Sequence, residues 1–189
     1  MEKFISHTGT GVPLRRSNVD TDQIIPARYL KRSRTDPQYA DYLFHDLRFN
    51  DRDEANPAFV LNQSAFRGAS ILIADENFGC GSSREAAVYA LEAFGIRAVI
   101  APSFGDIFHN NCFQNGLLPI ALPEAVVKQI AAETEASQGA RHTAIDLVRQ
   151  VVITPEGAEI PFSIDARKRD AMLEGLDDIA LTLRLKDQI

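Results

Sequence analysis

The chain has 189 residues, 45% apolar and 24% charged, which is the composition of an ordinary globular protein with its own core. Its 20 basic and 26 acidic residues give a formal charge of −6, which argues against a nucleic-acid-binding surface because such a surface needs a basic face. Two cysteines are too few for a disulfide framework or an iron–sulfur site, and no apolar run approaches the roughly 18 residues that span a membrane, so we expect a cytoplasmic protein.

The first third of the chain predicts short elements. Residues 1–25 are extended pieces broken by glycine and proline, and the acidic cluster at residues 20–22 predicts a turn. Residues 29–57 are charged and aromatic, with one short helix expected near residues 37–44. An excursion of this length in a compact domain is typical of a binding loop or a lid.

The middle of the chain alternates between predicted strands and helices. Strands are expected near residues 70–74, 98–101 and 119–122, and helices near residues 83–94, 105–115 and 123–137. This alternation is typical of parallel βαβ units. Gly95 and Gly116 stand where a glycine commonly ends a helix.

After residue 140 the pattern changes. Residues 144–165 predict a β-hairpin around the turn at residues 155–157, followed by a helix at residues 166–176 and an extended stretch at residues 178–184. The sequence therefore predicts one α/β domain over residues 1–189, with parallel βαβ units and a C-terminal hairpin.

The stretch GCGSSREAA at residues 79–87 follows a predicted strand and opens a helix. One interpretation is helix capping alone, because Ser82 and Glu85 have the spacing of a capping box and the glycines permit a tight turn. The other is an anion site, because backbone N–H groups at a helix start, together with Arg84, stabilise negative charge. Such a site binds a carboxylate or lowers the cost of ionising a serine hydroxyl, and spacing does not separate these uses.

The familiar glycine-rich motifs fit this stretch badly. Arg84 stands where the dinucleotide fingerprint needs its third glycine, and no Gly-Lys-Ser/Thr phosphate loop is present. The serines also lack the flanking glycines of a hydrolase elbow. Nucleotide-binding and serine-hydrolase chemistry are therefore disfavoured.

Four stretches together resemble the small swivelling domain of the aconitase superfamily. They are NFGCGSSREAAVYAL at 77–91, NVDTDQIIPARYL at 18–30, VIAPSFGDIFHNNCFQNGLLPI at 99–120 and GLDDIALTL at 175–183. The four stretches occur in the same order as in that domain, and the resemblance covers essentially the whole chain. The chain most resembles the free-standing small subunits of the 3-isopropylmalate dehydratase family of leucine biosynthesis. The resemblance implies a swivelling β/β/α fold.

The resemblance also implies a chemistry. It implies a hydro-lyase that interconverts 2-isopropylmalate and 3-isopropylmalate through isopropylmaleate, with a [4Fe–4S] cluster on a separate large subunit and no metal ligand in this chain. Ser82 is then the expected base, as an alkoxide, and Arg84 the expected clamp for a substrate carboxylate. Ser83 is expected to contact substrate beside them. Asp22 matches an acidic active-site position, with a turn residue that caps its own backbone as the alternative.

Residues 27–34 resemble the substrate-specificity loop of the family. An isopropyl group needs an apolar wall, for which Tyr29 and Leu30 are candidates. The three arginines of this loop are candidates for a substrate carboxylate, with solvated surface residues as the alternative: Arg28, Arg32 and Arg34.

One position departs from the family pattern. Ala86 stands where the family usually has histidine, which leaves the preferred diacid open. The alternative functions are the small subunit of a related 2-hydroxy-diacid dehydratase, of the citraconate/methylmalate or homoaconitate type, and a non-catalytic subunit that binds a small anion.

Overall fold

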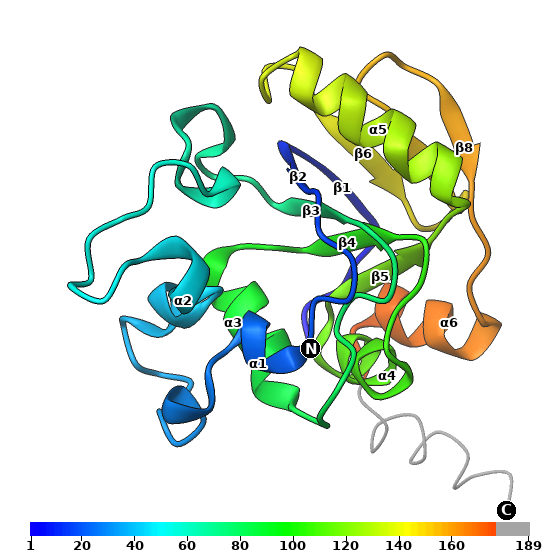
Figure 1. Cartoon of the computed structure of the whole chain (residues 1–189). Coiled ribbons are helices and arrows are strands. Elements are labelled where there is room, and N and C mark those ends of the chain that lie inside the picture. The colour runs from blue at the N-terminus through cyan, green and yellow to red at the C-terminus, as the bar shows by residue number, and fades with distance from the viewer. Residues whose placement is uncertain (177–189) are drawn as a thin grey trace, which may run out of the picture.

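The computed structural model describes residues 1–176, and within them the strands form two four-stranded sheets (Figure 1). The parallel sheet has the order β2 (Gly11–Leu14), β3 (Ile71–Ala74), β4 (Ala98–Ala101) and β5 (Leu118–Ala121). The antiparallel sheet has the order β1 (Ser6–Gly9), β6 (Thr143–Asp146), β7 (Val151–Ile153) and β8 (Glu159–Pro161). The predicted mixed α/β fold with parallel βαβ units is confirmed.

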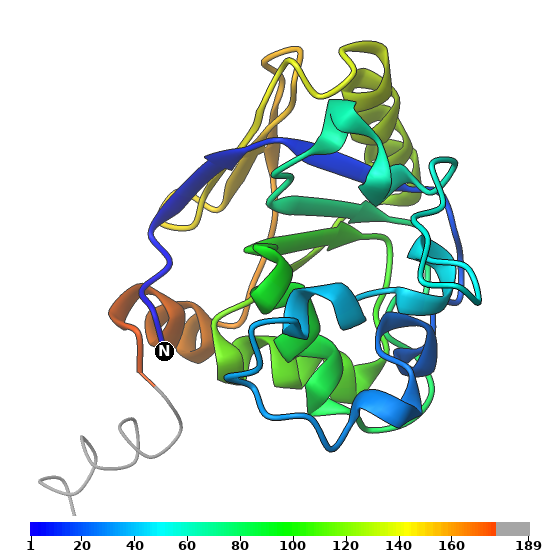
Figure 2. The same cartoon turned by 90° about the vertical axis from the view of Figure 1, so that its left-hand side faces the viewer.

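The helices cover both faces of the parallel sheet. Their bounds are α1 (Thr21–Ile24), α2 (His45–Arg48), α3 (Glu85–Phe94), α4 (Asp106–Asn115), α5 (Glu124–Ala136) and α6 (Ala166–Glu174). Short 3-10 turns lie at Ala27–Tyr29, Tyr39–Tyr42, Val60–Asn62 and Ser64–Phe66. Figures 1 and 2 both show α3 and α4 on one face of the parallel sheet and α5 on the other. None of the helices in residues 1–176 is long and apolar enough to cross a membrane.

Alternate residues of the parallel strands enter two different cores. Leu72 and Val99 join the core that contains the apolar face of α3. Ile71 and Ile73 join the core that contains α5 and parts of the antiparallel sheet. Every residue of β3 is buried, as expected for a parallel strand with helices on both faces.

The C-terminal hairpin is confirmed as β7 and β8, but it is part of a larger sheet. β6 pairs with β7, and Ser6 of β1 lies opposite Asp146 of β6. The sequence pattern shows local pairing and gives no sign that the first strand pairs with a segment so distant in the chain. The predicted stretch at residues 178–184 lies outside the described residues.

Two local predictions in the first third are wrong. Residues 20–22 start a helix instead of a turn, because the Asp20 carboxylate accepts the Gln23 N–H at 2.8 Å while the Gln23 side chain accepts the Asp20 N–H at 3.2 Å. The helix expected near residues 37–44 is only the 3-10 turn Tyr39–Tyr42. Phe44 then adopts a left-handed φ of 49°, and α2 begins after it.

Candidate functional site

The glycine-serine turn, which we define as residues 79–84, lies at the carboxyl ends of parallel strands. Phe78, after β3, bridges in parallel to Phe104, which follows β4, and Cys80 bridges in parallel to Asp20, which follows β2. Ligands of open parallel sheets bind at this edge. The fold therefore places the turn where a site is expected.

Two glycines in the turn have backbone angles that other residues rarely adopt. Gly79 has a φ of 73° and Gly81 a φ of 86°. A Cβ on Gly79 would lie 2.2 Å from Cγ of Phe108, and a Cβ on Gly105 would lie 2.5 Å from the Gly79 carbonyl oxygen. The start of α4 therefore packs directly against the turn, and the predicted tight glycine turn is confirmed.

The turn presents unpaired donors to solvent. Gly81, Ser82 and Ser83 are exposed, and within residues 1–176 their N–H groups donate to no acceptor. In the same part of the chain the Ser82 and Ser83 hydroxyls have no hydrogen-bond partner. Unpaired backbone N–H groups near a helix start favour negative charge. Their presence here agrees with the anion-site interpretation.

The capping-box interpretation of the same stretch is wrong. The residue that precedes α3 is Arg84, and no side chain caps this helix end. Glu85 does not reach back to Ser82, because its carboxylate accepts a hydrogen bond from Nδ2 of Asn115 at 2.9 Å. That bond comes first among the causes that lower the pKa of Glu85.

Asp22 and Arg84 are brought together although they lie far apart in the sequence. Nη1 of Arg84 forms an ion pair with the Asp22 carboxylate, and the Arg84 side chain is only 17% exposed. Asp22 lies in the first turn of α1, where Asp20 provides the cap, so the Asp22 carboxylate is left for Arg84. The predicted base, clamp and acidic residue thus lie on two adjoining segments.

Thr21 is a residue of this site that the sequence reading missed. Its N–H donates to the Cys80 carbonyl at 3.0 Å, and its Oγ1 donates to the Ser82 carbonyl at 2.8 Å. The side chain is buried. Its position between two aspartates in the motif was the available signal.

The loop arginines have separate partners. Arg28 pairs with Asp46, whereas Arg34 pairs with Glu92 at 3.2 Å and lies 3.6 Å above the ring of Tyr89. Arg32 forms no salt bridge in the described part of the chain. Two of the three arginines therefore attach the loop to its surroundings.

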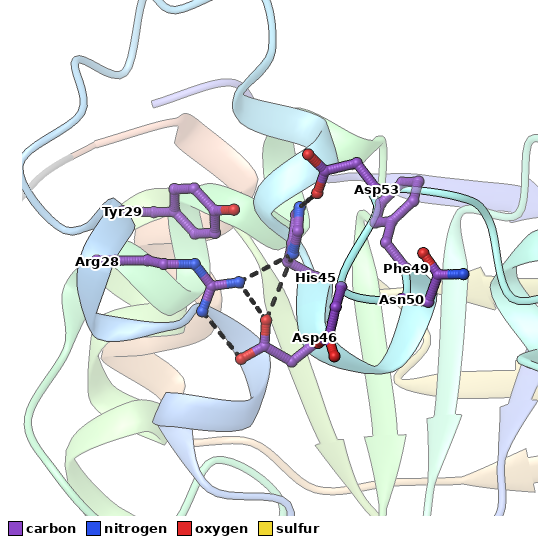
Figure 3. Close-up of a pocket in the computed structure, with 8 residues that line it drawn as sticks. Arg28, Tyr29, His45, Asp46, Phe49, Asn50 and Asp53 are labelled. Carbon is purple, nitrogen blue, oxygen red and sulfur yellow. Dashed lines mark hydrogen bonds and ion pairs between the residues drawn. The ribbon is translucent and has the colours of Figure 1, made fainter.

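A pocket of about 410 Å³ lies beside this loop, and no residue of the glycine-serine turn lines it. Figure 3 shows the side chains around it. Arg28 reaches Asp46, and His45 lies between the carboxylates of Asp46 and Asp53 at 3.4 and 3.5 Å. The hydrogen bond between Arg28 and Asp46 raises the pKa of Arg28 and lowers the pKa of Asp46. The residues that line the pocket are Arg28, Tyr29, His45, Asp46, Phe49, Asn50, Asp51 and Asp53.

The two candidates for the apolar wall differ in their surroundings. Tyr29 stacks on Tyr42 with the ring centroids 4.2 Å apart, so its ring is already engaged within the excursion. Leu30 is 38% exposed. Of the two, Leu30 therefore presents the more exposed apolar side chain.

The cysteines of this chain do not fit an iron–sulfur cluster. Cys112 is fully buried on α4, where burial raises the pKa of its thiol well above the ordinary value, and Cys80 lies partly exposed in the turn. Within residues 1–176, no group of three or more His, Cys, Asp or Glu side chains is arranged to hold a metal ion.

The chain matches known proteins over its whole length. Residues 1–125 match the model of the aconitase C-terminal domain, and residues 128–166 match the LeuD_N model. The 3-isopropylmalate dehydratase small subunit of Rhodospirillum centenum is 54% identical over 189 residues, which is 100% of this chain and 92% of that protein. The chain belongs to the 3-isopropylmalate dehydratase small-subunit family. The small subunit of Polaromonas sp. is 51% identical over 197 residues, an alignment that covers 100% of this chain and 91% of the Polaromonas protein.

A solved structure supports the same family. The 3-isopropylmalate dehydratase (LeuD) of Methanocaldococcus jannaschii has a TM-score of 0.69 and 29% identity, covering 97% of this chain and 98% of that one. The resemblance drawn from the four motifs is thereby confirmed. Ala86, the departure from the family pattern, is half-buried and packs against the core beneath α3, so no polar side chain acts at that position.

Proposed function

We propose that this chain is the small subunit of a 3-isopropylmalate dehydratase in leucine biosynthesis, active with a large subunit that carries the [4Fe–4S] cluster. The observation that carries the proposal is the exposed turn next to Arg84. There, three backbone N–H groups and two serine hydroxyls have no hydrogen-bond partner within residues 1–176. The names of the curated relatives favour isopropylmalate over the related diacids and over a non-catalytic anion-binding subunit. The cytoplasmic location stays a prediction.

Ser82 is proposed as the base that removes a proton from the carbon next to a substrate carboxylate. A serine hydroxyl is too weak an acid to ionise at neutral pH without help. The unpaired N–H groups of the turn that leads into α3, together with Arg84, are proposed to stabilise negative charge at that hydroxyl. Ser83 offers a further hydroxyl and N–H to the substrate.

Arg84 is proposed as the carboxylate clamp. A guanidinium has five N–H donors, so Arg84 keeps donors for a substrate while Nη1 stays on Asp22. Asp22 holds the guanidinium in place. Within residues 1–176, Arg28 and Arg34 form salt bridges and Arg32 forms none, so Arg32 is the loop arginine proposed to meet a substrate carboxylate. Leu30, which is 38% exposed, is the proposed apolar contact.

An anaerobic assay tests this function. The chain, a cluster-loaded large subunit and their mixture are each supplied with 2-isopropylmalate, and the ultraviolet absorbance of isopropylmaleate is followed. We expect turnover only in the mixture, because the turn is open to solvent in this chain and needs a second surface to enclose it. Turnover by either chain alone would contradict the shared site. Activity on another 2-hydroxy diacid alone would contradict the substrate.

Replacing Arg84 by glutamine is expected to raise KM for 2-isopropylmalate by roughly 10- to 100-fold, since a hydrogen bond to a charged group contributes about 1.5–3 kcal/mol. KM and kcat are measured on the mixed subunits. The control is Arg149→Gln, which breaks an exposed pair with Glu159 on the antiparallel sheet and should leave KM unchanged. An unchanged KM in Arg84→Gln would remove the clamp role.

A further inference from the structure

Thr21 connects the first turn of α1 to the glycine-serine turn by two hydrogen bonds. Its backbone N–H donates to the carbonyl of Cys80 at 3.0 Å, and its hydroxyl donates to the carbonyl of Ser82 at 2.8 Å. Thr21 itself is 1% exposed, so it makes both bonds from a buried position, although Ser82 is exposed. The next residue, Asp22, pairs with Arg84. The short helix α1 therefore contacts both the backbone around Ser82 and the side chain of Arg84, on which the proposed chemistry depends.

The two acceptor carbonyls belong to peptide units whose N–H groups are unpaired. The Cys80 carbonyl shares a peptide unit with the Gly81 N–H, and the Ser82 carbonyl shares one with the Ser83 N–H. Neither N–H donates to an acceptor within residues 1–176. A hydrogen bond accepted by a carbonyl polarises its peptide unit, which strengthens the N–H of that unit as a donor. Both bonds from Thr21 thus favour negative charge at the turn.

We propose that Thr21 is a positioning residue for the reaction: its hydroxyl fixes the Ser82–Ser83 peptide and strengthens the Ser83 N–H as a donor to the negative charge on the ionised serine. The inference rests on the proposed function, in which Ser82 is the base. Thr21 acts through the turn and touches neither substrate nor cofactor. Its contribution is to the ionisation of Ser82, so it acts on kcat and its pH dependence more than on substrate affinity.

Two substitutions separate the hydroxyl from the rest of the side chain. Thr21→Val keeps the branched shape and the N–H bond to Cys80 but removes the bond to Ser82. Thr21→Ser keeps the hydroxyl and removes only the methyl group. Urea unfolding of each variant and its assembly with the large subunit are measured alongside, so that a loss of fold is recognised.

In the assembled enzyme, Thr21→Val is expected to lower kcat about tenfold, the effect of one net hydrogen bond, with KM changed by less than about threefold. The acidic limb of the kcat profile moves to higher pH, because the serine is harder to ionise. Thr21→Ser restores both. The proposal is overturned if Thr21→Val keeps the wild-type kcat and pH profile, or if the serine variant is as impaired as the valine variant.

A second readout does not depend on turnover. In the isolated small subunit, the backbone ¹⁵N and ¹H shifts of Ser83 report whether the Ser82 carbonyl accepts a hydrogen bond. We expect these signals to move in Thr21→Val and to stay near wild type in Thr21→Ser. Unmoved signals in Thr21→Val overturn the inference whatever the activity. If the signals move as expected but the wild-type mixture does not act on isopropylmalate, the proposed function fails while Thr21 is still shown to shape the turn.

Discussion

Replacing Ser82 by alanine is expected to lower kcat of the assembled enzyme by roughly 10³-fold, within the range for the loss of a general base. The hydroxyl has no hydrogen-bond partner in residues 1–176 and is exposed, so the urea midpoint of the variant should match wild type. Substrate affinity should change little, because the clamp and the backbone N–H groups stay. The measurements are steady-state kinetics on the mixed subunits and urea unfolding of the small subunit.

Ser83→Ala is the matched control for this experiment. It removes the hydroxyl of the adjacent residue, which is also exposed, and keeps the N–H groups of the turn. We expect a smaller loss, about tenfold or less, because a substrate contact is lost and the base is kept. If Ser82→Ala retained turnover within tenfold of wild type, or if Ser83→Ala were the more damaging change, Ser82 would not be the base.

Replacing Gly79 by alanine is expected to destabilise the small subunit by about 3 kcal/mol or more. Its φ of 73° costs a residue with a side chain about 1–2 kcal/mol, and the added Cβ would lie 2.2 Å from Cγ of Phe108, which adds the cost of overpacking. The measurement is the free energy of unfolding in urea.

Gly68→Ala is the matched control for that substitution. Gly68 has nearly the same φ, 75°, but nothing lies within 4 Å of the added Cβ. We expect it to cost only the conformational strain, about 1–2 kcal/mol. Equal losses in the two variants would show that the contact between the turn and Phe108 contributes nothing, and that α4 does not hold the turn in place.

The sequence predicted the elements whose causes are local. The helices after β3 and β4 end at Gly95 and Gly116, which have φ values of 104° and 89°, as the glycine signal indicated. The fully apolar β3 and β4 were equally clear. The excursion at residues 29–57 was harder, because its chain direction depends on a left-handed Phe44 and on ion pairs such as Arg28 with Asp46, which no periodicity reveals.

The candidate site was predicted in part. The family motifs selected Ser82, Arg84 and Asp22, and the structure brings Asp22 and Arg84 into contact across distant segments. The capping interpretation failed because Asn115, at the end of another helix, takes the Glu85 carboxylate. Thr21 was missed because its role depends on carbonyl groups of a segment that only the folded chain places beside it.

The pairing of β1 with β6 affects the order in which a nascent chain completes its fold. All four strands of the parallel sheet have emerged once residue 121 leaves the ribosome, but Ser6 must wait for Asp146 to pair in register. Until then the edge of β1 is unpaired, and closing so long a loop costs chain entropy before any contact stabilises it. Such an edge is a template for pairing between chains, so the interval between these two points is when this small subunit is most exposed to aggregation.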